Sequence, residues 1–153
     1  MDVTHREQVA AFLKSQSTLS LATTAADGTP HAAPLFYFAD EQLRLYWLSS
    51  ASSRHSRNLR HRPEAAVSMY APTDDWKQIR GVQMRGSVVV VSARSGRGEI
   101  VAAYCDRFQL GASFQTAIAR SRLYRLQPQW VRYLDNSKRF GYKFEFRVKA
   151  SGE

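Results

Sequence analysis

The residues best suited to chemistry lie in segment 43–58, LRLYWLSSASSRHSRN, where an alternating strand pattern is followed by serines and an Arg-His-x-Arg cluster. The serine hydroxyls can donate hydrogen bonds, and the Arg54 guanidinium can donate a charge-assisted pair. The first amides of a following helix would add a favourable dipole. These groups predict a phosphate site, and we expect the phosphate to be the tail of a cofactor. The serines concerned are Ser49, Ser50, Ser52 and Ser53.

Two other interpretations of this segment stay open at the level of residue types. A serine-rich start is typical of an exposed basic helix that needs only a cap, and residue types alone favour that interpretation. Alternatively, Arg54, Arg57 and His61 recur at spacings of three and four and would form a basic face for a nucleic acid backbone. Nucleic acid is the less favoured partner, because the nearby aromatics Tyr46 and Trp47 lie on a strand that also needs a core.

Composition predicts one globular domain over residues 1–153, with 44% hydrophobic and 12% aromatic residues. Cys105 is the only cysteine, so no intrachain disulfide and no cysteine-rich zinc module is expected. The first residues lack the apolar run of a signal peptide, and the longest aliphatic run, residues 88–91, is too short to cross a bilayer. We therefore expect a cytoplasmic protein with no membrane partner. The formal net charge of +9 suits nucleic acid, an anionic surface or a phosphorylated ligand.

Hydrophobic spacing predicts a helix, then strands, then further helices and strands. Thr4 and Glu7 form a capping box for a helix over 4–15, and Asp27-Gly28 predicts a hairpin turn between strands. Pro63 is expected to stop a short helix over 54–61. In the following long strand, Gly81 and Gly86 are candidate bulges or sites where the strand curls, and Pro128 limits the strand over 122–133 to an edge or a bend. The other predicted strands cover 18–23, 31–39, 43–48, 65–70 and 78–92, the other helices 98–108 and 113–121, and residues 144–148 form a last strand or dock on a partner.

This order predicts a β-rich α+β fold. Neighbouring strands joined by short turns are mostly antiparallel, and closing such a sheet removes its exposed edges. We therefore expect a small closed or partly closed antiparallel barrel flanked by short helices. No metal site is expected, because His55 and His61 are six residues apart and do not share a helical face.

Three segments follow one another in a recognisable order: TLSLATTAADGTPHAAPLFYF after the first helix, LYWLSSASSRHSRNLRHRPEAAVSMY, and RGVQMRGSVVVV. In this order and spacing the chain resembles the pyridoxamine 5'-phosphate oxidase-like superfamily, the FMN-binding split β-barrels, and its branch of small bacterial proteins. The resemblance covers residues 4–92. It implies a split β-barrel fold, an FMN cofactor, and a homodimer with the flavin at the interface.

The resemblance also implies which residues hold the cofactor. The FMN phosphate falls on Ser53, Arg54 and His55, with Ser49 as the hydroxyl at the strand end. His55 stands where the family has a lysine, so its charge is expected to vary near neutral pH. The flavin ring is implied to lie against the backbone of the second strand. The matching residues of that strand are Pro34, Leu35, Phe36 and Tyr37.

A polar side chain on the long strand is implied to reach the pyrimidine end of the flavin. Gln83 and Arg80 both match, and spacing does not decide between them. The final segment, FGYKFEFRVKASGE, lacks the Arg-x-His type motif of pyridoxamine phosphate oxidases proper. We therefore expect an FMN-dependent oxidoreductase with a nicotinamide or small-molecule substrate. The alternatives are a flavin carrier without turnover and a binding protein for another phosphorylated ligand or a tetrapyrrole.

Overall fold

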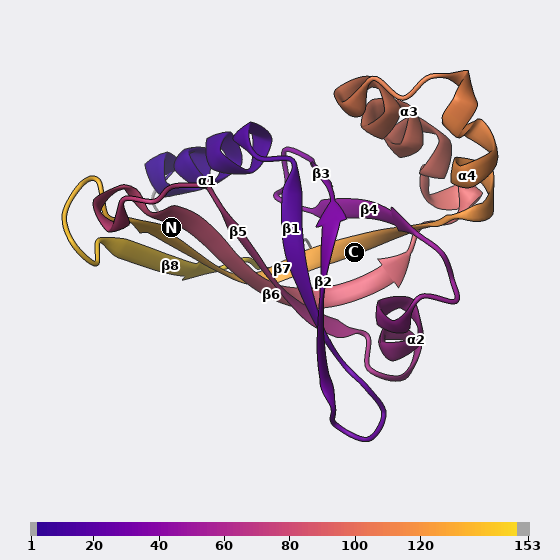
Figure 1. The fold of residues 1–153 in the computed structure, drawn as a ribbon, viewed down its shortest axis with the longest axis horizontal. Coiled ribbons are helices and arrows are strands. Elements are labelled where there is room, and N and C mark those ends of the chain that lie inside the picture. Colours follow the sequence, from indigo (N-terminus) through magenta and orange to yellow (C-terminus); the bar gives the residue numbers. More distant parts are fainter. Residues whose placement is uncertain (1–2, 150–153) are drawn as a thin grey trace.

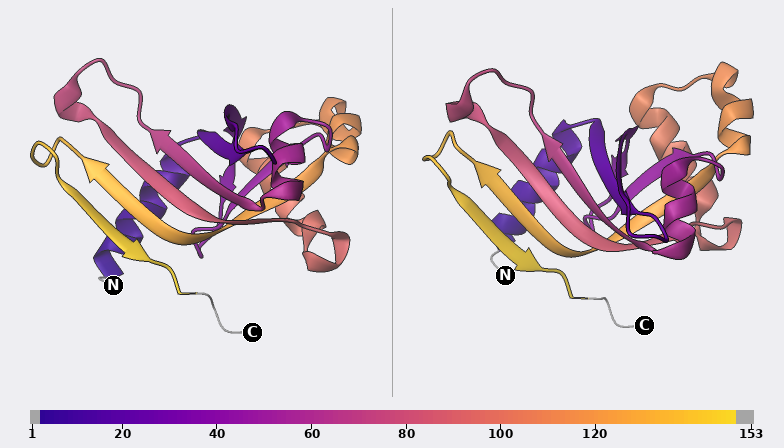
Figure 2. Two further views of the ribbon diagram at one scale, coloured as in Figure 1. Left: turned by 90° about the horizontal axis from the view of Figure 1, so that it is seen from below. Right: turned by 60° about the horizontal axis from the view of Figure 1, so that its bottom comes forward.

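One antiparallel sheet forms the body of the protein. The computed structural model describes residues 3–149, whose eight strands pair in the order β2-β1-β5-β6-β7-β4-β3, with β8 beside β7 (Figure 1). The sheet curls into a half-barrel flanked by helices (Figure 2). This confirms the β-rich α+β class and the antiparallel split barrel. The strands are β1 (Thr18–Thr24), β2 (Pro30–Phe36), β3 (Phe38–Ala39), β4 (Leu45–Ser49), β5 (Glu64–Tyr70), β6 (Arg80–Val90), β7 (Arg122–Asp135) and β8 (Lys143–Arg147).

Helices lie at separate places around the sheet (Figure 1). The first helix buries Val9, Phe12 and Leu13 in the core and so covers part of the interior. The second follows β4, and the last two lie together away from the first (Figure 1). The helices are α1 (Val3–Ser15), α2 (Arg54–His61), α3 (Arg97–Phe108) and α4 (Gln115–Arg120), with 3-10 turns η1 (Trp76–Gln78), η2 (Ala93–Ser95) and η3 (Ala112–Phe114). No helix in the described range is long and apolar enough to span a membrane.

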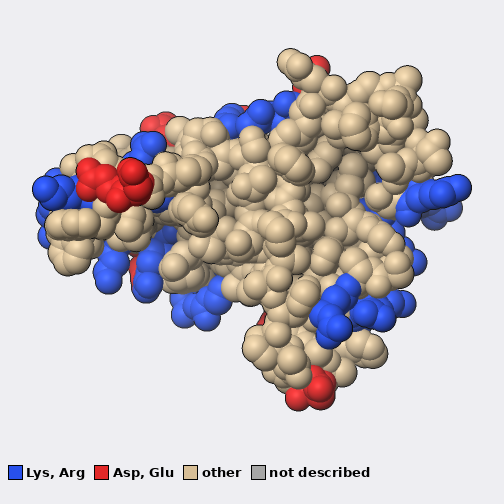
Figure 3. Space-filling model, in the orientation of Figure 1, with Lys and Arg blue, Asp and Glu red and all other residues tan. Residues whose placement is uncertain are grey.

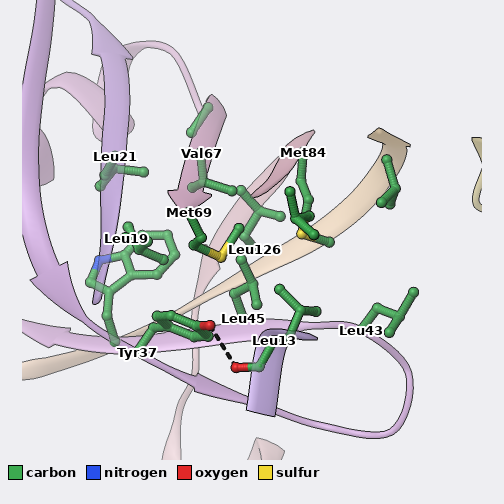
Figure 4. Packing of buried hydrophobic residues seen from close by; sticks show 14 of the residues in the cluster. Leu13, Leu19, Leu21, Tyr37, Leu43, Leu45, Val67, Met69, Met84 and Leu126 are labelled. Carbon is green, nitrogen blue, oxygen red and sulfur yellow. Dashed lines mark hydrogen bonds between the residues drawn. The ribbon is translucent and has the colours of Figure 1, made fainter. Parts of the chain in front are cut away.

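The core forms because apolar residues alternate along the strands. On β1, Leu19 and Leu21 are buried while Ser20 and Ala22 are exposed, and β5 and β6 repeat this alternation. The buried side chains of these strands meet inside the curled sheet (Figure 4). Because successive side chains of a strand point to opposite faces, the polar and small residues form a separate outer face.

A β-bulge bends the two longest strands. The β6–β7 register shifts between Arg85 and Gly86, because Arg85 pairs with Trp130 while Gly86 pairs with Pro128. Gly86 is required there, since a Cβ atom would lie 1.9 Å from the Gln127 carbonyl oxygen. This confirms the bulge predicted at Gly86 and the bend predicted at Pro128. β7 is an interior strand, and Pro128 lies between the residues paired with β4 and those paired with β8.

Other sequence predictions differ from the structure in detail. The bulge proposed at Gly81 is wrong, because the register continues through it, and this glycine instead allows a close approach to the Met69 carbonyl oxygen. The strand predicted over 31–39 is interrupted at Tyr37, whose amide donates to the Ser17 carbonyl oxygen at 3.0 Å. β4 begins only at Leu45, since Leu43 has a positive φ of 63°. The last segment does add a strand, β8, beside β7.

Candidate functional site

The start of α2 is built by serines that bond to one another. Ser53 is the N-cap, and its Oγ accepts a hydrogen bond from the Ser56 amide at 3.3 Å. The same oxygen lies 2.9 Å from the Ser50 carbonyl oxygen and 2.7 Å from Ser56 Oγ. The hydroxyls of Ser50 and Ser52 pair at 2.8 Å. The capping interpretation is therefore correct for Ser53, and a phosphate at this place would compete with bonds inside the loop.

The hydroxyl of Ser49 is bonded to His55 inside the fold. Ser49 Oγ and His55 Nε2 lie 2.7 Å apart, and both residues are buried. Burial lowers the pKa of His55, and the nearby His31 on β2 lowers it further. The imidazole is therefore neutral at neutral pH and supplies no fixed charge, unlike the lysine that the family has there. The sequence analysis placed His55 at the phosphate. It did not show that the His55 side chain points inward, because its partner Ser49 lies six residues earlier in the chain.

Arg54 is a free cation at this junction. Its side chain is exposed at the first position of α2, and none of the ion pairs found in the described part of the chain involves it. The Arg54 and His55 amides belong to the first turn, so they have no acceptor within the helix. Opposite charge is attracted to such a helix start. The junction thus offers a guanidinium and amide donors to an anion.

The four residues implied to face the flavin ring are divided between two faces. Tyr37 is 1% exposed, and its hydroxyl donates to the Leu13 carbonyl oxygen at 2.6 Å, so it is a core residue (Figure 4). Leu35 also packs against the core, whereas Pro34 and Phe36 are exposed on the outer face. Among the strands of residues 3–149, β2 pairs only with β1, so its other edge is open in the sense that no strand pairs with it. The backbone of β2 therefore remains available to a ligand, while Tyr37 does not.

Gln83 and Arg80 point to opposite faces of β6. Gln83 is exposed on the outer face, in register with Ser68 on β5 and Arg132 on β7. Arg80, the first residue of β6, is in register with Asp135 on β7. Gln83 is three strands from β2, which corresponds to about 14 Å at the usual strand spacing. Within one chain, Gln83 is therefore remote from a ring that follows the open edge of β2.

The outer face also carries a hollow that sequence reasoning missed. We call it the outer trough; its volume is about 530 Å³. Residues of β1, β2, β5, β6, β7 and β8 line it. Alternation along β6 and β7 indicates which side chains face outward, but strand order is needed to bring them together. The lining includes Ala22, Ala66, Arg85, Trp130 and Arg147.

The described residues offer no alternative metal centre. Within residues 3–149, no group of three or more His, Cys, Asp or Glu side chains is placed to hold a metal ion. Cys105 is half-buried in α3 between Tyr104 and Asp106. The candidate groups therefore remain the junction of β4 and α2, the open edge of β2, and the outer face.

The fold and the junction define the class of split β-barrel proteins. Residues 5–135 match the family described as pyridoxamine 5'-phosphate oxidase, so the chain belongs to that family. A UPF0306 protein of Yersinia pseudotuberculosis is 25% identical over 137 residues, which are 88% of each chain.

Solved structures share the fold. HutZ, the heme storage protein from Vibrio cholerae, has a TM-score of 0.68 at 22% identity, covering 80% of this chain and 88% of that one. A putative pyridoxamine 5'-phosphate oxidase from Listeria innocua has a TM-score of 0.66 at 21% identity, covering 87% of this chain and 99% of that one. At these identities the likeness concerns the fold.

Proposed function

We propose that this protein binds FMN, with the phosphate at the start of α2 and the ring along the open edge of β2. The observation that carries the proposal is Arg54, an exposed cation without an ion-pair partner in the described residues, at the start of a helix that follows a strand end. Family membership over residues 5–135 supports it. The site residues proposed are Arg54 and the first amides of α2, and Ser53 caps the helix that presents them.

The chain's own residues would bind and orient the cofactor. Arg54 would pair with the phosphate as a two-donor fork, and the first-turn amides would hold its remaining oxygens. The β2 backbone would offer donors and acceptors to the ring edge, and Phe36 would exclude water beside it. Bound FMN supplies hydride acceptance, so no acid or base of the chain is required. We propose a flavin-dependent oxidoreductase on this basis, with a substrate other than pyridoxamine phosphate.

We also propose a homodimer, in which a second copy of the chain would cover the bound ring. A ring bound along the edge of β2 would leave room for a second copy, because no strand of residues 3–149 pairs with that edge. Gln83 is too far from β2 to reach that ring, so a Gln83 that contacts it belongs to the second copy. A two-fold arrangement would then complete two equivalent sites.

The direct test is FMN titration of the purified protein, followed by quenching of flavin fluorescence. Arg54→Ala should weaken FMN binding about 10- to 100-fold, because a charge-assisted bond contributes about 1.5–3 kcal/mol. The matched control is Arg57→Ala, which removes an exposed arginine of the same helix and should leave the affinity within about twofold. Riboflavin, which lacks the phosphate, should bind both variants equally. No quenching at high FMN, or equal affinities in both variants, would contradict the proposal.

Turnover separates an oxidoreductase from a carrier. If NADH or NADPH reduces the bound flavin without oxygen and an acceptor reoxidises it within seconds, the protein is an enzyme. A flavin inert to both would identify a carrier.

The fold likeness to HutZ favours a second candidate, heme. The spectrum of the chromophore that copurifies decides between the candidates. Oxidised flavin gives two bands in the near ultraviolet and blue, whereas heme gives one intense Soret band. A Soret band, with heme identified by mass spectrometry, would replace FMN as the ligand.

A further inference from the structure

One row of side chains crosses the outer face of the sheet, and every member except Ala32 lines the outer trough. Neighbouring members belong to paired strands, so each lies beside the next. The first half of the row is a shelf of methyl groups, and the second half alternates guanidinium, indole and guanidinium. In order from β2 to β8, the row is Ala32, Ala22, Ala66, Arg85, Trp130 and Arg147.

The arginines near Trp130 differ in their partners. The guanidinium carbon of Arg85 lies 4.7 Å from the Trp130 ring centroid, and that of Arg132 lies 5.1 Å from it. Arg132 donates to Glu145 Oε2 at 2.8 Å and 3.0 Å, so its charge is compensated. Within residues 3–149, no ion pair compensates Arg85 or Arg147. Trp130 therefore holds the unpaired guanidinium of Arg85 in place, and the indole face under that guanidinium is not available for stacking with a ligand.

The shape and charge of the trough define what fits. Its volume of about 530 Å³ lies in the range of small-molecule sites. A second hollow shares Ala22, Ala66, Arg85 and Trp130 with it, so the shelf is continuous. Glu64 is the one acidic residue of the lining, against Arg85 and Arg147. A flat apolar body would lie on the alanines, and a carboxylate or phosphate would meet the arginines, which bind such groups with two parallel bonds.

We propose that the outer trough is a second ligand site, separate from the start of α2, for a small planar aromatic molecule that carries a carboxylate or phosphate. Arg85 binds the anion, Trp130 positions Arg85, and the alanines admit the ring. The site does not depend on FMN binding.

The test is an NMR titration of the full chain with 2-naphthoate, following the indole N–H signal of Trp130, which Trp130→Phe assigns. The neutral 2-naphthamide is the matched probe and should bind at least about tenfold more weakly, because it lacks the charge. Arg85→Gln and Arg147→Gln should each weaken naphthoate binding about tenfold. Arg60→Gln, an exposed arginine on α2, and Arg54→Ala should leave it unchanged, which separates this site from the phosphate site.

Three outcomes would overturn the proposal. The first is that naphthoate at millimolar concentration does not shift the Trp130 signal. The second is that naphthoate and naphthamide bind with equal affinity. The third is that the Trp130 indole is shielded from a soluble paramagnetic probe before any ligand is added. The last result would mean that a second copy of the chain fills the trough.

Discussion

At the scale of single residues, His55 makes the stability of the fold depend on pH. Burial holds its pKa below the ordinary value of 6.5. Between the lowered and the ordinary pKa, the unfolded chain binds a proton that the folded chain does not, so the free energy of unfolding falls as pH falls below about 6.5. His55 thus stabilises the fold fully above that pH, and its contribution is lost toward acid.

Urea unfolding of wild type and His55→Gln at about pH 7.5 and pH 5.5 checks this dependence. Wild type should lose more free energy of unfolding between the two conditions than His55→Gln does. The matched control is His61→Gln, an exposed histidine of the same helix, which should keep the wild-type loss. Ser49→Ala should cost about 1–3 kcal/mol at the higher pH, because it removes the partner of a buried ring nitrogen. Equal losses in wild type and His55→Gln would show that the histidine is not buried as a neutral group.

At the scale of elements, local signals predicted what depends on neighbours in sequence. α2 spans Arg54–His61 as expected, because Ser53 caps its start and Pro63 follows its end. The ring-facing strand was harder to predict. Tyr37 breaks the strand and turns into the core to bond Leu13, which is 24 residues away, so sequence spacing does not show which of its neighbours face outward. The outer trough could not be predicted from the sequence, because the residues that line it come from strands that are distant in sequence.

The β-bulge supplies the prediction at this scale. Gly86→Ala places a Cβ atom against the rigid backbone at Gln127, so it should reduce the free energy of unfolding by about 3 kcal/mol, measured by urea denaturation. Gly98→Ala is the matched control, because Gly98 lies in α3 with no atom within 4 Å of its added Cβ. This control should be neutral or stabilise the protein by up to about 1 kcal/mol. Equal effects of the two changes would contradict the close approach at the bulge.

At the scale of the whole molecule, the net charge is +9, and on the face that Figure 3 shows the basic residues do not gather in one patch. On the face that Figure 3 shows, Lys and Arg lie at several separate edges, with the arginines of α2 as one group among them. A nucleic acid interface usually gathers its basic residues on one continuous surface. This distribution favours a small anionic ligand held by a few arginines, as the proposals for α2 and for the outer trough both require.

The dimer is the prediction that belongs to the whole molecule. Phe36 is 57% exposed on β2, beside the proposed ring, and Val89 is 46% exposed near the end of β6. If a second copy covers the ring, light scattering should give twice the mass of one chain. Phe36→Lys should then weaken association at least about tenfold by placing a charge in the interface, whereas Val89→Lys should not. Because two copies complete each site, FMN should tighten the dimer, and FMN affinity should rise with protein concentration. A monomer of unchanged mass at saturating FMN would exclude a shared site and leave each chain to hold the flavin alone.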